Sequence, residues 1–147
     1  MHKQACFYAS GFLYHPASQQ ILLQQPITAP KPSLWALFEG ASIGQESPQT
    51  TFKRIIAKIL GLKLNLKVIY PAYSYYCSEI HKDRQIIYAP LKTAKNFPAK
   101  KGVTFGWFTF KQITKLPLST QAKHDVIVAQ RVIAASVRKS LGQLNRE

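Results

Sequence analysis

The segment SPQTTFKRIIAKILG, residues 47–61, most constrains the fold because it carries helix signals at both ends. Ser47 is a favoured N-cap residue, and Pro48 suits the first helical position, where its missing N–H costs nothing. Gly61 supplies the left-handed residue that commonly ends a helix. Between these ends, apolar residues recur at helical spacing and share one face: Phe52, Ile55, Ile56, Ile59 and Leu60. The sequence therefore predicts a helix over about 48–60 with one buried face.

The remaining hydrophobic patterns predict strands and a second long helix. Six strands are expected, at Ala5–Tyr14, Gln20–Gln25, Leu34–Phe38, Leu62–Ser78, Arg84–Leu91 and Val103–Phe110. Residues 120–144 follow a helical period, and their predicted inner face comprises Val126, Ile127, Ile133, Val137, Leu141 and Leu144. This order of elements predicts a single α/β domain over residues 1–147, with a mixed, largely non-parallel sheet.

The chain is strongly basic, with 20 Lys and Arg against 6 Asp and Glu and a formal net charge of +14. Such a charge attracts polyanions, including nucleic acids and nucleotides, although it also serves solubility alone. No apolar run approaches the ~18–20 residues of a membrane span, so we expect a cytoplasmic protein that does not bind membranes. Cys6 and Cys77 lack metal-ligand spacing, which predicts two reduced, buried thiols.

The segment from residue 40 to 62 resembles the Nudix box, G-x5-E-x7-R-E-U-x-E-E-x-G-U, in which U is a bulky aliphatic residue. The box positions are matched without insertion by Gly40, Glu46, Arg54, Ile56, Gly61 and Leu62. The preceding WALFEG is similar to the family's W-x-x-P-G-G, with Phe38 for proline and Glu39 for the first glycine. GWFTFKQITKL and the long helix after it resemble the family's closing segment. The resemblance covers nearly the whole chain and implies a Nudix-like α/β/α sandwich.

The box departs from the family pattern where the family binds metal, because Ile55, Lys58 and Ile59 replace its glutamates. In Nudix hydrolases those carboxylates hold the Mg²⁺ ions that polarise a diphosphate and activate the attacking water. Isoleucine offers no oxygen ligand, and an ammonium group repels a divalent cation. The resemblance therefore implies a degenerate box with no metal, no cofactor and no catalytic residue expected. Should hydrolase activity remain with Mg²⁺ or Mn²⁺, a rearranged site would draw on Glu39, Glu46 and Glu79.

Several cations are candidates for binding an anionic ligand. Lys58 suits a phosphate, or is a solvated lysine on the helix edge. Arg54 is expected to pair with Glu46 and brace the loop onto the helix. On the family's layout, residues 92–101 border the substrate cleft and combine an aromatic ring with cations, which suits a nucleotide base or single-stranded nucleic acid. The candidates in this loop are Lys92, Lys95, Phe97, Lys100 and Lys101, although a flexible charged loop explains the same composition.

Two further groups of polar residues have ordinary structural explanations. Glu79, His81 and Asp83 alternate as a metal or acid–base cluster would, but they also have the composition of a solvated hairpin turn. The His124–Asp125 pair opens the last helix, and we interpret it as local capping.

Three functional hypotheses follow. The first is a catalytically silent Nudix-like module that binds a nucleotide, a nucleic acid or another anionic ligand. The second is an active hydrolase of a nucleoside diphosphate-linked substrate with a rearranged metal site. The third is a protein-interaction scaffold, such as a homodimer, in which the aromatic segments YPAYSYYC and FGWFTF supply an interface.

Overall fold

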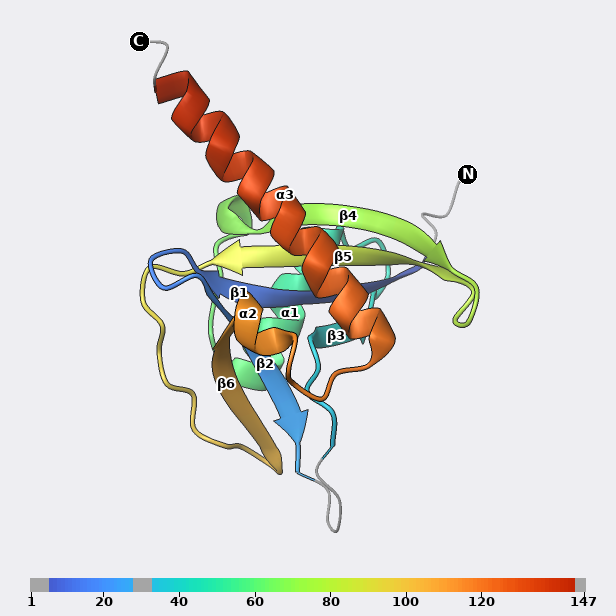
Figure 1. The fold of residues 1–147 in the computed structure, drawn as a ribbon. Coiled ribbons are helices and arrows are strands. Elements are labelled where there is room, and N and C mark those ends of the chain that lie inside the picture. The colour runs from blue at the N-terminus through green and yellow to red at the C-terminus, as the bar shows by residue number, and fades with distance from the viewer. Residues whose placement is uncertain (1–5, 28–32, 145–147) are drawn as a thin grey trace, which may run out of the picture.

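The computed structural model describes residues 6–27 and 33–144 as a sheet between helices (Figure 1). The strands are β1 (Phe7–His15), β2 (Gln20–Pro26), β3 (Phe38–Ala41), β4 (Tyr70–Cys77), β5 (Lys82–Pro90) and β6 (Val103–Thr109). The helices are α1 (Pro48–Leu60), α2 (Phe110–Ile113) and α3 (Thr120–Leu144), with a short 3₁₀ helix, η1, at Leu66–Val68. The sheet order is β4-β5-β1-β2-β6, with β3 paired to β1.

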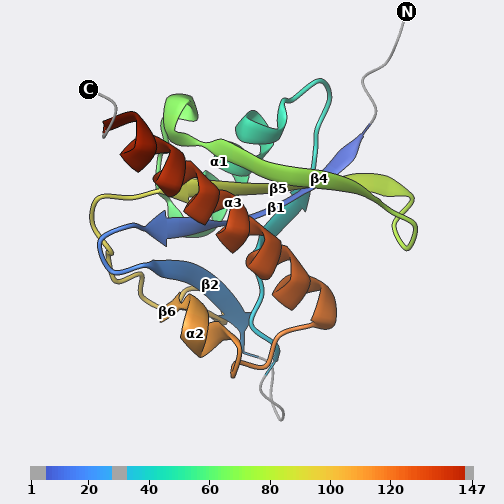
Figure 2. The ribbon, with the colours of Figure 1, turned by 45° about the horizontal axis from the view of Figure 1, so that its top comes forward.

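The sheet is mixed, as predicted, and it divides at β1. One edge of β1 pairs in parallel with β5 from Phe7 to Tyr14. The other edge pairs antiparallel with β3 over its first half and with β2 at its end, so two strands share one edge. The β2–β6 ribbon consequently diverges from the other strands (Figures 1 and 2).

Both faces of the sheet are buried, each under one long helix. Alternate residues of β1 enter opposite cores: Ala9 and Leu13 lie on the α1 side, and Phe12 and Tyr14 on the α3 side. Figures 1 and 2 show α1 and α3 on opposite faces. The predicted α/β/α arrangement is therefore confirmed, and the central strands are apolar on both faces because each face has its own helix to cover.

Helix α1 forms where its local signals predict. The Ser47 side chain accepts a hydrogen bond from the Thr50 backbone N–H, and Gly61 takes a φ of 67°. Phe52, Ile55 and Ile56 are buried against the sheet. The apolar face predicted from the residue spacing is the face of α1 that packs against the sheet.

Two predicted strands are placed wrongly. In place of a strand at 34–38, β3 begins at Phe38, while Trp35 and Ala36 form only isolated bridges and Leu34 is 51% exposed. The predicted strand at 62–78 forms only from Tyr70 onward, and the residues before it turn through η1. Sequence composition favours strand throughout, but only the residues that reach β5 have a partner to pair with.

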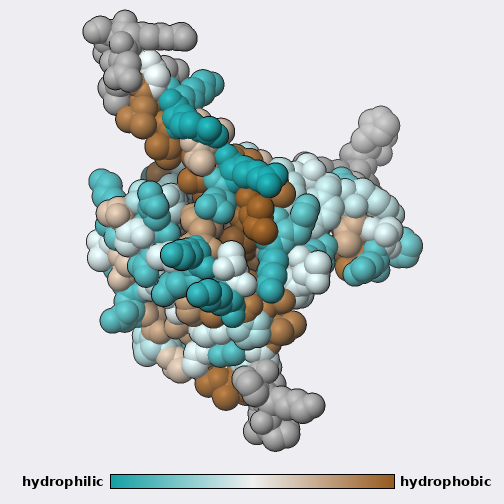
Figure 3. All heavy atoms as spheres, viewed as in Figure 1, coloured by the Kyte–Doolittle hydropathy of each residue, from teal (hydrophilic) through white to brown (hydrophobic). Residues whose placement is uncertain are grey.

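The inner face of α3 is also different from the prediction. The buried hydrophobic residues of α3 are Ala122, Val126, Ala129 and Ile133, so the prediction is confirmed for Val126 and Ile133, whereas Ile127, Val137 and Leu141 are 45%, 51% and 54% exposed. The second half of α3 extends past the sheet, where hydrophobic side chains reach the surface (Figures 1 and 3). The side chain of Leu144 lies outside the described residues. No helix in the described ranges combines the length and apolar character needed to span a membrane.

The two cysteines differ in their surroundings. Both are free thiols, but Cys6 is exposed and only Cys77 is buried. The prediction of two buried thiols is therefore wrong for Cys6, which lies at the exposed position directly before β1.

Candidate functional site

The loop before α1 is fastened to the helix by an ion pair between Glu46 and Arg54. The Arg54 Nε donates to Glu46 Oε2 at 2.9 Å and Nη2 donates to Oε1 at 3.0 Å, which confirms the predicted pair. Glu46 Oε1 also accepts from the Ile43 N–H and the Thr51 hydroxyl. These hydrogen bonds, chiefly those from Arg54, lower the pKa of Glu46 to about 2. Glu46 is thus a fully engaged structural carboxylate.

The three positions at which the Nudix box has metal-binding glutamates hold other chemistry here. Ile55 is buried, and its Cδ1 lies 2.9 Å from where a Cβ on Gly40 would stand, so it fills the space beside that glycine. Ile59 is half-buried and Lys58 is exposed. A magnesium ion requires oxygen ligands, and none of these three side chains supplies one. The residues present therefore do not fit the metal that the fold family implies.

A small cavity between the end of α1 and the start of β6 is lined by two of these three residues, Lys58 and Ile59. It measures about 200 Å³, and its lining includes Lys58, Lys100 and Lys101 above Ile59 and Phe105. We call it the lysine cavity. A second compartment of about 220 Å³ shares Ile59, Lys100 and Phe105 with it and adds Phe97. Four of the predicted ligand-binding residues are thus brought together: Lys58, Phe97, Lys100 and Lys101.

A tight turn holds the two loop lysines at this cavity. Lys100 and Val103 exchange backbone hydrogen bonds of 2.9 and 3.0 Å, and Lys101 and Gly102 between them have positive φ. The Phe97 ring packs edge-on against Phe105 at 6.4 Å. The 92–101 loop is therefore anchored to β6 at its end, next to α1.

Other predicted ligand-binding residues lie elsewhere. The Lys95 carbonyl accepts from the Trp107 indole, and Lys92 lines a separate cavity beside the β1–β2 turn. Arg54 is engaged by Glu46 and lines a further cavity with Lys53 and Lys63. These three residues, Lys92, Lys95 and Arg54, do not line the lysine cavity.

A buried ionic cluster on the α3 side was not predicted. Arg84 on β5 donates from Nη2 to Glu39 on β3 at 3.0 Å and to Asp125 on α3 at 3.3 Å. Asp125 is fully buried and also accepts from the Tyr73 and Tyr75 hydroxyls. Burial, reinforced by this hydrogen bond, raises the pKa of Tyr73. We call these residues the Arg84 cluster; they link β3, β4, β5 and α3.

The Arg84 cluster corrects the capping interpretation of Asp125, which is wrong. Its carboxylate points into the core because Asp125 lies on the buried face of α3, next to Val126 and one turn from Ala122 and Ala129. The sequence held a usable signal, since Arg84 is in phase with Ile86 and Tyr88, which belong to the core on the α3 side. A charged residue in that phase requires a buried partner of opposite charge.

The three carboxylates considered for a rearranged metal site are in different places. Glu39 belongs to the Arg84 cluster, Glu46 is held by Arg54, and Glu79 is exposed in the β4–β5 turn with His81, just before Asp83 at the start of β5. Over the described ranges, no three His, Cys, Asp or Glu side chains are grouped so that they could hold a metal ion.

Comparisons with known proteins identify the fold. No protein-family model and no curated protein sequence matches the chain. Its structure matches a MutT from work on Aliivibrio salmonicida and Vibrio cholerae, with a TM-score of 0.65 and 12% identity over 88% of this chain and 96% of that one. The NUDIX domain of Shewanella oneidensis NrtR matches with a TM-score of 0.65 and 17% identity over 90% of each chain. The C-terminal domain of mouse MUTYH matches with a TM-score of 0.64 and 16% identity over 87% and 89%. The chain therefore has the Nudix fold.

The Glu46–Arg54 pair predicts a pH-dependent contribution to stability. A carboxylate whose pKa is depressed on folding stabilises the native state above its unfolded pKa and loses this effect as the pH falls through its folded pKa. Glu46→Gln should lower the free energy of unfolding by roughly 1–2 kcal/mol at pH 7. Because the pKa moves from 4.5 to about 2, the difference should shrink between these values. Urea denaturation at pH 7, 4 and 2.5 measures it. Glu79→Gln, which removes an exposed carboxylate, is the control, and a pH-independent loss in Glu46→Gln would contradict the assignment.

The Arg84 cluster predicts a larger effect at neutral pH. Asp125→Asn leaves the buried Arg84 with Glu39 alone, and breaking a buried ion pair costs about 3 kcal/mol or more. The matched change Asp83→Asn, at an exposed position at the start of β5, should stay within about 0.5 kcal/mol. Urea denaturation of both variants at pH 7 gives the comparison, and equal stabilities would show that the cluster contributes nothing.

Proposed function

We propose that the chain is a Nudix-fold binding module without metal-dependent hydrolysis, and that the lysine cavity holds the phosphate of a nucleotide or nucleic acid. One observation carries this proposal: where the family's box presents carboxylates to a metal, this chain presents Lys58 beside Lys100 and Lys101. The charge offered to a ligand at this position is therefore inverted, so a phosphate is attracted directly instead of through a cation.

The lysine cavity suits a phosphate group in size and surroundings. Lys58, Lys100 and Lys101 line one small cavity, and an anion bound there would reduce the repulsion between their charges and accept their N–H donors. Ile59 and Phe105 form an apolar floor, which strengthens ionic hydrogen bonds by excluding water. About 200 Å³ is too small for a whole nucleotide, but the adjoining compartment offers the Phe97 ring for contact with a base.

The distribution of charge over the molecule also favours an anionic ligand. Three carboxylates, Glu39, Glu46 and Asp125, are engaged by arginines, whereas the lysines of the described ranges form no ion pairs. The remaining described acids are both exposed, Glu79 in the β4–β5 turn and Asp83 at the start of β5. The excess positive charge is thus uncompensated around α1 and the 92–101 loop. The NrtR NUDIX domain, which has the same fold, was crystallised with ADP ribose, and this supports a nucleotide-type ligand.

Removing the cavity lysines should weaken binding of both ADP ribose and a labelled oligothymidylate. We expect Lys58→Gln, and the pair Lys100→Gln with Lys101→Gln, each to raise Kd about tenfold, because each loses charged hydrogen bonds worth about 1.5 kcal/mol or more. Calorimetry measures the ADP ribose affinity and fluorescence anisotropy the oligonucleotide affinity, at several salt concentrations. The slope of log Kd against log salt should fall by about 0.7 per lost phosphate contact for the single strand.

The control for this experiment is Lys115→Gln, which removes an exposed lysine outside both compartments. Equal losses in Lys58→Gln and Lys115→Gln would mean that net charge alone drives binding, and would contradict the proposal. Turnover of ADP ribose that requires Mg²⁺ or Mn²⁺ and disappears in Glu46→Gln would instead support the hydrolase hypothesis. A cytoplasmic location and a homodimer stay predictions.

A further inference from the structure

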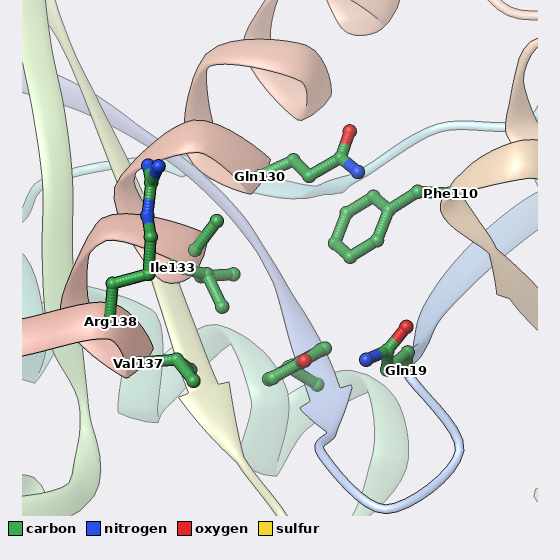
Figure 4. Close-up of a pocket in the computed structure, with 8 residues that line it drawn as sticks. Gln19, Phe110, Gln130, Ile133, Val137 and Arg138 are labelled. Atoms are coloured by element: carbon green, nitrogen blue, oxygen red, sulfur yellow. The ribbon is translucent and has the colours of Figure 1, made fainter. Parts of the chain in front are cut away.

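A larger cavity lies on the α3 face of the sheet, away from the lysine cavity. It measures about 480 Å³, is open to solvent and is bordered by α3, by α2 and by the β1–β2 turn (Figure 4). The Phe110 ring forms one apolar wall, and Ile133 and Val137 lie across the cavity from it. Tyr14 also lines the cavity, with its ring 6.1 Å from that of Phe110. Its volume falls within the range of small-molecule sites, and its walls are apolar as such sites require.

Several polar side chains at this cavity make no hydrogen bond within the described residues. Tyr14 is only 8% exposed as a whole residue. Its hydroxyl is not one of the fully buried atoms that lack a partner, so it reaches solvent at the cavity, where a ligand could bind it. Burial raises the pKa of Tyr14, which keeps the phenol neutral and able to donate. The side chains of Gln19 and Gln130 also lie at the cavity, and neither makes a side-chain hydrogen bond within the described ranges.

The charge at the rim restricts the class of ligand. Arg138 is the charged residue that lines the cavity, and it forms no ion pair within the described part of the chain. No carboxylate lines the cavity, so nothing there favours a cation. An unpaired guanidinium beside an aromatic wall matches a molecule that is apolar over most of its surface and anionic at one end.

We propose that this cavity binds a small ring-containing molecule with one anionic group. Its rings pack between Phe110 and Ile133, and its carboxylate, sulfonate or phosphate binds Arg138 at the rim. The Tyr14 hydroxyl and the two glutamine amides supply hydrogen bonds that orient it. The site shares no residue with the lysine cavity and does not depend on the function proposed for it.

A matched pair of fluorescent probes tests the proposal. 8-Anilinonaphthalene-1-sulfonate carries two apolar ring systems and one anionic group, and N-phenyl-1-naphthylamine is the same skeleton without the sulfonate. Both should bind wild-type protein and fluoresce more strongly. Arg138→Gln should weaken the sulfonate probe roughly tenfold, as expected for a lost charged hydrogen bond. It should leave the affinity for the uncharged probe unchanged.

Two further variants separate this cavity from general surface binding. Arg131→Gln removes an exposed arginine of α3 outside the cavity and should not change either probe's affinity. Ala134→Trp, at an exposed position lining the cavity, should fill it and abolish binding of both probes. Unchanged sulfonate binding in Arg138→Gln, or an equal loss in Arg131→Gln, would overturn the proposal. So would wild-type protein that sediments as a dimer which Ala134→Trp dissociates, since a second copy would then occupy this surface.

Discussion

The ion pair between Glu46 and Arg54 holds together the part of the molecule in which a Nudix box is normally built around metal. Arg54 reaches both oxygens of Glu46 and also donates to the Ala41 carbonyl at 2.9 Å, so it ties the end of β3 and the following loop to α1. The loop therefore needs no bound cation to stay in place. Because the loop and α1 are fixed, Gly40 and Ile55 stay in contact, and α1 keeps its alignment over the sheet.

This brace explains how the box positions could change chemistry without loss of the fold. Ile55 adds a buried apolar contact to the core beneath α1. Lys58 and Ile59 lie further along the helix, where they meet the lysines of the 100–103 turn. On the other face of the sheet, Arg84 forms ion pairs with Glu39 and Asp125, so these two carboxylates are also paired with an arginine. The result is a Nudix fold in which three lysines line the cavity at the end of the box helix.

The parts of this account that could be predicted from the sequence are those with local causes. The ends of α1 followed from Ser47 and Gly61, and the β1–β2 hairpin and the limits of α3 followed from periodicity and turn residues. The start of the strand predicted at 62–78 could not be predicted, because it depends on where β5 ends. The inner face of α3 could not be predicted either, because it depends on where the sheet ends. The family's layout placed the whole 92–101 loop beside the substrate cleft, but neither this layout nor local spacing could distinguish Lys100 and Lys101 from Lys92 and Lys95. Asp125 was misread because its partners lie 41 to 52 residues away.

Metal binding measured by calorimetry tests the central claim most directly. Wild-type protein and the variant Lys58→Glu/Ile59→Glu, which returns two carboxylates at an exposed and a half-buried position, would each be titrated with Mg²⁺ and Mn²⁺. The account predicts no saturable heat from the wild type and a saturable response from the variant, because only the variant offers oxygen ligands at these positions. Wild-type protein that binds either metal as tightly as the variant would contradict the claim that this box has exchanged its metal site for a cationic one.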